Sequence, residues 1–243
     1  MLNKSNIANI LSVTHHKKVA GVINYAILKT VVKLVGCKDF DTEEHLIRCY
    51  QYLEILLREM KKHREYRLFV KSLNVESFLM ASMLHDIGKI SISDIVLLKP
   101  ERLTNVEYEE VKRHVEEGVK ILENLLLDFP NCDLLQYAKV FAGAHHEHWD
   151  GSGYYQGLKG EEIPLPGRML AIIDVYDALT GDRIYKDPMP HHKAIEIISQ
   201  GKGTHFDPNL TDLFLKKAHL IKSVRKIPRD AQGHFIFNVS QCA

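Results

Sequence analysis

The apolar residues of this chain recur at helical spacing along almost its whole length. One stripe runs through residues 22–34 and another through 46–60, with apolar side chains three or four positions apart. The same spacing recurs in five further segments, at 75–85, 115–127, 134–144, 190–199 and 209–219. Alternating patterns typical of strands are almost absent, and 233–239 is the one candidate. The sequence therefore predicts an all-α fold.

Length, charge and cysteine usage narrow the class of protein. A chain of 243 residues suits one large domain or one domain with extensions. The formal net charge of +1 argues against a globally basic nucleic-acid binder, so no DNA partner is expected. The most apolar stretch, 19–36, is too short and too charged to span a bilayer, and no signal peptide is visible. Four scattered cysteines without a CxxC pair indicate reduced thiols. We expect a cytoplasmic protein without a membrane partner.

The segment 145–155, HHEHWDGSGYY, gathers three histidines and two carboxylates. Adjacent histidines are poor core residues, because each buried ring brings two nitrogens that need partners. His85 and Asp86 form a second pair sixty residues upstream. Such redundant pairs are typical of chains that hold more than one metal ion. Taken alone, the upstream pair has a simpler interpretation, with His85 capping the end of a helix and Asp86 solvated.

Further candidates favour the metal interpretation. His114 lies on a predicted helix, and Asp174 interrupts an otherwise apolar one. His45 opens the second helix with Asp41 four residues earlier, on the same face. Each alone is more often a surface or capping residue, but together they predict one polynuclear metal site in a helical bundle. Iron, manganese, nickel and zinc all suit such ligands. His148 is not expected to be a ligand, and six histidines are assigned to the surface: His15, His16, His63, His191, His192 and His219.

Basic residues near these candidates suggest a phosphate ligand. Lys89 follows the His85-Asp86 pair, and Arg183 and Lys186 follow the Asp174 helix. Arginine can bind two phosphate oxygens at once, and lysine supplies a point charge. An ordinary solvated basic loop explains Arg183 and Lys186 equally well. The glycine- and proline-rich stretch 150–166 predicts a long functional loop.

The chain resembles the HD-GYP phosphodiesterases, a branch of the HD-domain metal-dependent phosphohydrolases. The resemblance rests on seven blocks in order: DTEEH (41–45), HDIGK (85–89), LLKPERLT (97–104), HVEEG (114–118), HHEHWDGSGYYQGLKGEEIP (145–164), DVYDALTGDRIYK (174–186) and THFDP (204–208). It implies an HD-domain helical bundle with the C-terminal helices of the HD-GYP branch over about 25–220. A short N-terminal helical extension (1–24) and a basic tail (221–243) would flank it.

The resemblance also implies an activity, namely hydrolysis of cyclic di-GMP to linear pGpG and on to GMP. Two or three divalent ions, iron or manganese first, would be the cofactors. The implied ligands are His45, His85, Asp86, His114, His145, His146 and Asp174, with Asp41 where members with three metals carry glutamate. A hydroxide shared by two metals bridged by Asp86 would attack phosphorus, with Lys89 offsetting phosphoryl charge. The implied substrate-binding residues are Lys89, Tyr154, Asp177, Arg183 and Lys186.

The chain departs from the family pattern at the signature tripeptide, where Tyr155 replaces proline. The change restores a backbone N–H and predicts a more mobile loop. Substrate preference, or a signalling-protein partner that binds the loop Gly153–Tyr155, would then differ from the relatives. Ser93 and Gly167 also replace a family proline and alanine. Two alternatives stay open: a weakly catalytic module that binds metal and cyclic dinucleotide, and a hydrolase of a hybrid cyclic dinucleotide. A homodimer is equally open.

Overall fold

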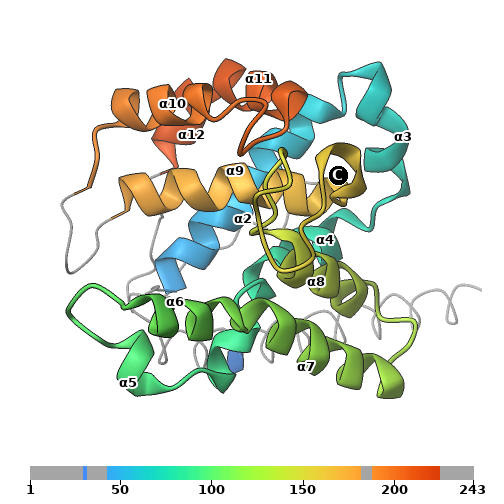
Figure 1. The fold of residues 1–243 in the computed structure, drawn as a ribbon. Helices are drawn as coiled ribbons and strands as arrows, with labels where there is room; N and C mark the ends of the chain where they lie inside the picture. Colours follow the sequence, from blue (N-terminus) through green and yellow to red (C-terminus); the bar gives the residue numbers. More distant parts are fainter. Residues whose placement is uncertain (1–29, 32–42, 182–187, 225–243) are drawn as a thin grey trace, which may run out of the picture.

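The computed structural model describes residues 30–31, 43–181 and 188–224 of the chain (Figure 1). Within these ranges the fold is all-α, as predicted, and no β-strand occurs. The predicted N-terminal extension, the strand at 233–239 and most of the basic tail lie outside the described residues. The α-helices are α2 (Glu43–Met60), α3 (Arg64–Ser72), α4 (Val75–Ala81), α5 (Asp94–Leu97), α6 (Asn105–Lys112), α7 (His114–Asp128), α8 (Asp133–Ala144), α9 (Leu165–Thr180), α10 (His191–Gln200), α11 (Pro208–Lys216) and α12 (Ala218–Ser223). Three short 3-10 helices are η1 (Ser82–Leu84), η2 (Ile87–Ser91) and η3 (Gly160–Glu162).

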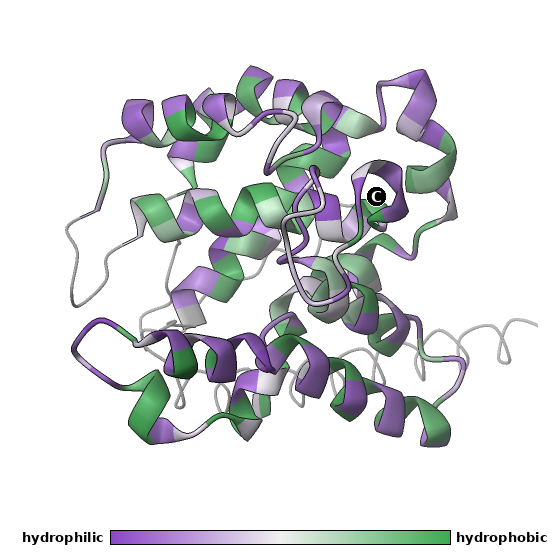
Figure 2. Ribbon diagram, viewed as in Figure 1, coloured by the Kyte–Doolittle hydropathy of each residue, from purple (hydrophilic) through white to green (hydrophobic). Residues whose placement is uncertain are grey.

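Helix α9 forms the centre of the molecule because most of its residues are apolar and buried. Its residues from Met169 to Ile173 are all buried, as expected for a helix without a solvent-facing stripe. It packs against α2, α8 and α10, and Figure 1 shows it between an upper layer of α10–α12 and a lower layer of α6 and α7. In Figure 2 the outer helices alternate between hydrophilic and hydrophobic residues along their length. The remaining core comes chiefly from α2, through residues such as Leu53 and Leu56.

The predicted helix at 75–85 is shorter in the structure than its apolar pattern suggests. Helix α4 ends at Ala81, and the chain continues through η1 and η2 with His85 and Asp86 at their junction. The break brings η2 against the first turns of α7, where Gly88 packs directly on backbone atoms of His114. A side chain at position 88 would prevent this approach. The tertiary contact, and not local helix preference, therefore decides where the helix ends.

The C-terminal helices also differ in detail from the prediction. Asp207 caps α11 through the backbone N–H groups of Asn209 and Leu210, with Pro208 at the first helical position, as predicted. The predicted helix at 209–219 is divided in two at Lys217. The predicted domain boundary after residue 220 falls inside α12, where Ile221 is fully buried in the core. The ordered helical core therefore includes at least this residue.

The fold has four further features. His191 does not lie on the open surface as assigned, because its ring is partly buried and its Nδ1 is 2.8 Å from the Tyr176 hydroxyl. Gly167 packs against α8, where a Cβ would lie 2.4 Å from Cβ of Ala144, so alanine would not fit there without movement. None of the described helices has the length and apolarity needed to cross a membrane. Cys49 and Cys132 are free thiols.

Candidate metal centre

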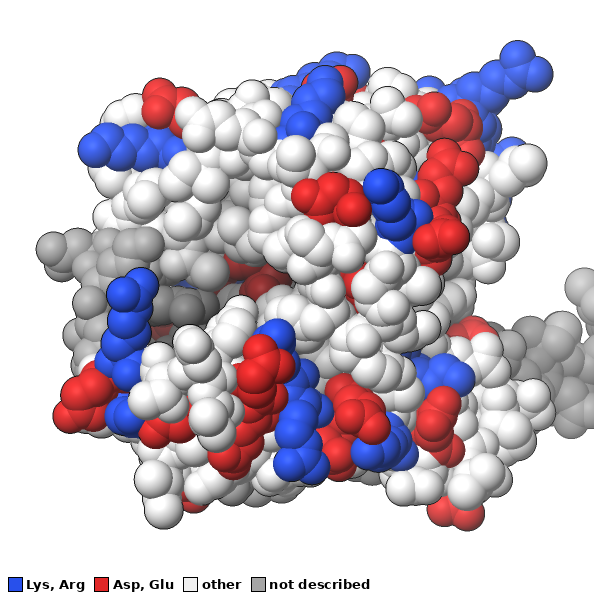
Figure 3. Space-filling model, viewed as in Figure 1, with Lys and Arg blue, Asp and Glu red and all other residues white. Residues whose placement is uncertain are grey.

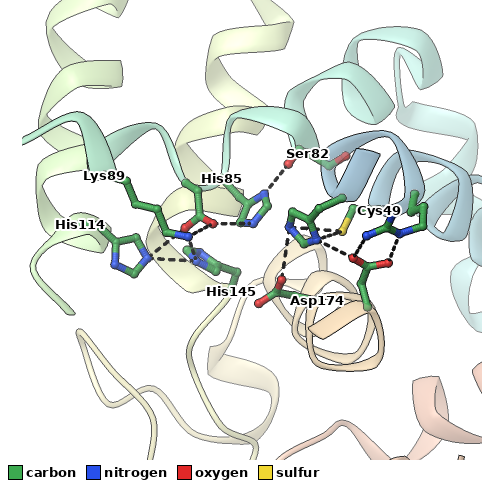
Figure 4. A network of polar contacts seen from close by, with 11 residues as sticks. Cys49, Ser82, His85, Lys89, His114, His145 and Asp174 are labelled. Atoms are coloured by element: carbon green, nitrogen blue, oxygen red, sulfur yellow. Dashed lines mark hydrogen bonds and ion pairs between the residues drawn. The ribbon is translucent and has the colours of Figure 1, made fainter. Parts of the chain in front are cut away.

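Histidines and carboxylates from five parts of the chain meet between α2, α7, α8 and α9 (Figure 4). They form overlapping sets in which the potential ligand atoms lie within 4.8 Å of one another. The first set contains Asp86, His114, His145 and His146. The second contains His45, His85 and Asp86, and the third contains His45, Cys49 and Asp174. All seven predicted ligands that lie in described residues are therefore brought together, whereas Asp41 lies outside them.

Asp86 belongs to two of the sets, and its two oxygens face different neighbours. Its Oδ1 is 3.2 Å from Nε2 of His114 and 3.6 Å from Nε2 of His145. Its Oδ2 is 3.2 Å from Nε2 of His85 and 2.8 Å from Nζ of Lys89. A carboxylate can donate one oxygen to each of two cations, so this placement suits a bridging ligand.

Hydrogen bonds at the back of the ring orient several of the predicted ligand histidines. In three of them Nδ1 donates to a backbone carbonyl: His85 to Ser82 at 2.8 Å, His114 to Val111 at 2.6 Å, and His145 to Phe141 at 3.0 Å. A carbonyl oxygen can only accept, so the proton resides on Nδ1 in each neutral ring. The lone pair of Nε2 then faces the shared centre, which is the tautomer that a metal ion requires.

The donor chemistry of the site fits divalent metal ions. Nε2 of His85 is buried and makes no hydrogen bond, although such atoms normally find a partner. Burial lowers the pKa of His145, and it lowers that of His146 well below the usual range with a further contribution from His145. Burial alone would raise the pKa of Asp86, but Lys89 and His85 hold it well below its usual value. An anionic Asp86 beside the neutral imidazoles of His145 and His146 is the form that binds a divalent cation.

The pKa of His85 moves in the other direction. Burial would lower it, but the neighbouring Asp86 carboxylate outweighs burial and raises the net value. In the metal-free protein a proton therefore competes for this nitrogen, and a bound metal would displace it. Lys89 is largely buried against the same carboxylate, so its ammonium group is fixed at the edge of the cluster.

Tyr154 and its loop cover the His146 side of the centre. The Tyr154 ring stacks on His146 with centroids 4.7 Å apart and an angle of 23° between the planes. The loop is held by Glu147, a buried carboxylate that accepts three backbone N–H groups, from Gln156 at 2.8 Å, Gly157 at 3.1 Å and Leu158 at 3.0 Å. The peptide bond before Tyr155 is cis, and the Tyr155 side chain is exposed. Glu147 thus fixes the loop next to a predicted ligand.

Other predicted residues lie in different surroundings. Asp174 is partly exposed, and its Oδ1 is 3.5 Å from Nε2 of His45. Asp177, expected at the substrate, is buried and contacts His45 and Arg48. His148 is in none of the ligand sets, and its ring lies on that of His205 with centroids 3.8 Å apart. Arg183 and Lys186 lie outside the described residues.

Two residues of the site were missed by the sequence analysis. Cys49 lies one turn after His45, with Sγ 3.7 Å from Nδ1 and 3.8 Å from Nε2. Because these distances are nearly equal, the sulfur faces the ring and not the lone pair of Nε2. Burial raises the pKa of Cys49 to about 12, so the thiol is protonated in the metal-free protein. Arg48, one position before Cys49, binds Asp177. Arg48 and Cys49 lie three and four positions after His45, so helical spacing from His45 could have indicated both residues.

Known proteins with related sequences act on cyclic dinucleotides according to their names. A "probable cyclic di-GMP phosphodiesterase" of Vibrio cholerae is 41% identical over 191 residues, covering 78% of this chain and 43% of that protein. A cyclic di-GMP phosphodiesterase of Thermotoga maritima is 34% identical over 206 residues, covering 85% of this chain and 52% of that protein. A 3'3'-cGAMP-specific phosphodiesterase 2 of Vibrio cholerae is 46% identical over 136 residues, covering 56% and 25%. The chain spans about half the length of these relatives, or less.

The family model described as "HD domain" matches residues 43–210, which include all seven of the assembled ligands. The match agrees with the resemblance to HD-GYP phosphodiesterases that the sequence blocks carry. By this match, the chain belongs to the HD domain family.

Proposed function

We propose that the chain is a metal-dependent phosphodiesterase that hydrolyses cyclic di-GMP to linear pGpG and on to GMP. The observation that carries the proposal is the placement of Asp86, with one oxygen toward His114 and His145 and the other toward His85 and Lys89. A carboxylate between two histidine groups suits a pair of divalent ions, a common arrangement in enzymes that cleave phosphoesters. The names of the related proteins support the substrate class.

The metals and the protein would have separate parts in the reaction. Divalent ions bound at this centre lower the pKa of a coordinated water and offset charge on phosphate oxygens. The chain itself supplies a buried anion, oriented imidazoles and the ammonium group of Lys89 beside Asp86. That ammonium can stabilise negative charge that develops on a phosphoryl oxygen. Figure 3 shows a hollow between α9 and α6 with acidic side chains at its floor, which would admit the substrate.

The finer assignments are part of the proposal. Iron and manganese are the proposed ions, since the histidine and carboxylate donors suit both. A third ion would use Asp41, and substrate phosphate would contact Arg183 and Lys186. These three residues lie outside the described part of the chain. Tyr154, which stacks on His146, would line the substrate side of the centre.

The test begins with protein purified without oxygen, in which bound metal is measured and cyclic di-GMP turnover is followed by chromatography. Asp86→Asn keeps the shape of the side chain but removes its charge. Both metal content and turnover should therefore fall by about 100-fold or more, which is on the order of the effect of losing a charged ligand group. Lys89→Met should retain metal and lose turnover. Lys193→Met, at an exposed position of α10, is the matched control and should change neither. Full turnover in Asp86→Asn with metal retained would contradict the proposal.

A hybrid cyclic dinucleotide is the second candidate substrate. The 46% identity over 136 residues with a 3'3'-cGAMP-specific relative favours it. Side-by-side turnover of cyclic di-GMP and 3'3'-cGAMP would rank the two substrates. A protein that is loaded with metal and binds both dinucleotides without cleaving either would instead support a binding and signalling module.

A further inference from the structure

His45 differs from the other oriented histidines in the group that holds the back of its ring. Its Nδ1 is 2.8 Å from Oδ2 of Asp177, a carboxylate, where the other three rings meet neutral carbonyls. Asp177 is in turn bound by Arg48, with Nε 2.6 Å from Oδ1 and Nη2 2.8 Å from Oδ2. This two-point pairing fixes the plane of the carboxylate as well as its position. A continuous chain therefore runs from Arg48 through Asp177 to His45.

The same contacts leave Asp177 poorly placed to bind substrate. Its side chain is 2% exposed, and both oxygens are engaged by Arg48 and His45. The guanidinium of Arg48 places a positive charge against both oxygens of this buried carboxylate.

The network also joins the two helices that supply ligands to one side of the centre. Arg48 lies one turn after His45 on α2, and Asp177 lies one turn after Asp174 on α9. The ion pair thus ties the α2 ligand to the α9 ligand, whose atoms Nε2 and Oδ1 are 3.5 Å apart. A carboxylate that accepts the Nδ1 proton of a ligand histidine orients the ring and strengthens Nε2 as a donor.

We infer that Asp177 is a positioning residue for the metal ion on the His45 side, and that Arg48 holds Asp177 in place. The inference rests on the proposed metal centre and deepens it, since it distinguishes the two sides of the cluster. On the side with His45, His85 and Asp174, the Asp177 carboxylate orients His45, whereas a backbone carbonyl orients His85. On the side with His114, His145 and His146, backbone carbonyls orient His114 and His145.

The test uses Asp177→Asn in the full chain, with Mn²⁺ titrated into metal-free protein and bound metal counted after dialysis. Loss of an outer partner of this kind weakens metal affinity by about 10- to 100-fold. One ion per chain should bind that much more weakly, while the other keeps its wild-type affinity. In the metal-free variant, the ring nitrogens of His45, followed by ¹⁵N NMR, should lose the preference for the Nδ1–H tautomer.

The chain offers a matched control in the pair of Arg168 and Asp207. Their side chains are exposed to the same extent as those of Arg48 and Asp177, at 14% and 2%, and Nη1 is 2.7 Å from Oδ2. Asp207→Asn breaks an equally buried ion pair but keeps a residue that caps α11 well. It should bind both ions with wild-type affinity. Equal metal loss in both variants would show that the Asp177 pair acts through stability alone, which would overturn the inference.

Two further outcomes are decisive. Asp177→Asn protein that binds both ions at wild-type affinity and keeps the His45 tautomer would refute the positioning role. Wild-type protein that binds no divalent ion would instead refute the proposed metal centre. If Asp177→Asn does not fold, Arg48→Lys keeps the charge but loses the two-point contact. Arg48→Lys should then lower the affinity for the same single ion by several-fold. Unchanged affinity for both ions would count against the inference.

Discussion

Replacing Gly88 by alanine should disrupt the fold and the metal centre together. A Cβ at this position would lie 1.9 Å from the carbonyl oxygen of His114 and 2.4 Å from the backbone N of Gly118. Ordinary contact begins at 3.4 Å, so η2 and α7 must separate by roughly 1.5 Å, the difference of the two values. Both obstacles are backbone atoms, so no change of rotamer relieves the clash. Overpacking of this kind lowers the free energy of unfolding by about 1–3 kcal/mol.

The same displacement reaches the metal ligands, because Asp86 stands just before η2 and His114 begins α7. The 3.2 Å approach of Oδ1 to Nε2 would open by about the same amount. Misplacement by about 1 Å can lower a reaction rate about 100-fold. We therefore expect Gly88→Ala to lose affinity for metal and about two orders of magnitude of turnover. Denaturant unfolding, metal analysis and the cyclic dinucleotide assay measure the three effects.

Gly143→Ala is the control, since Gly143 is also buried and faces α7. Its added Cβ would meet Cγ2 of Val119 at 3.1 Å, a side-chain atom that can move by a few tenths of an ångström. Alanine in a helix interior gains about 0.5–1 kcal/mol over glycine, which offsets that contact. Stability and metal content should stay near wild type. Gly88→Ala protein that is as stable and as metal-rich as wild type would refute the proposed close packing.

Three further predictions concern the loop, the pH dependence and the metal. Glu147→Gln leaves one oxygen and a donor group where three backbone N–H groups need acceptors, so the free energy of unfolding should fall by about 1–3 kcal/mol and the loop should be cleaved faster in limited proteolysis. Burial, aided by His148, lowers the pKa of His205 to about 4, against about 6.5 in the unfolded chain. Because the unfolded chain then binds one more proton than the folded chain, the free energy of unfolding should fall as the pH drops from about 6.5 to about 4. In urea unfolding of metal-free protein, His205→Asn should show a shallower fall over this pH range. The same pH dependence in the variant and the wild type would contradict the low pKa of His205. Removing metal with a chelator should lower the melting temperature, and Mn²⁺ at 100 times its Kd should restore about 2.7 kcal/mol per site; identical melting with and without metal would argue against binding to the folded state.

Much of the helical framework follows from local pattern. The apolar stripes at 115–127 and 134–144 lie within α7 and α8, and the stripe at 190–199 differs from the bounds of α10 by one residue at each end. The apolar pattern did not predict that α4 ends at Ala81, because the apolar spacing continues through His85. The packing of Gly88 on α7 decides where the helix breaks. Periodicity describes which face is buried, but it does not describe how closely two backbones approach.

The candidate site shows the same division. The predicted ligands came from the clustered histidines and carboxylates and from the motif blocks, and the structure places the described ones together. The surroundings of Asp177 were not predictable, because its partners His45 and Arg48 lie 132 and 129 positions away in the chain. The resemblance implied that Asp177 contacts the substrate, whereas in the structure Asp177 forms an ion pair with Arg48 behind the predicted ligand His45. Spacing within a single helix carries no information on such distant partners.

Anomalous X-ray diffraction from crystals grown with Mn²⁺ is the most direct test of the metal centre. We expect two strong peaks on opposite sides of the Asp86 carboxylate, one beside His114 and His145 and the other beside His45 and His85. A single peak, or peaks that do not contact Asp86, would contradict a bridged pair of metal ions.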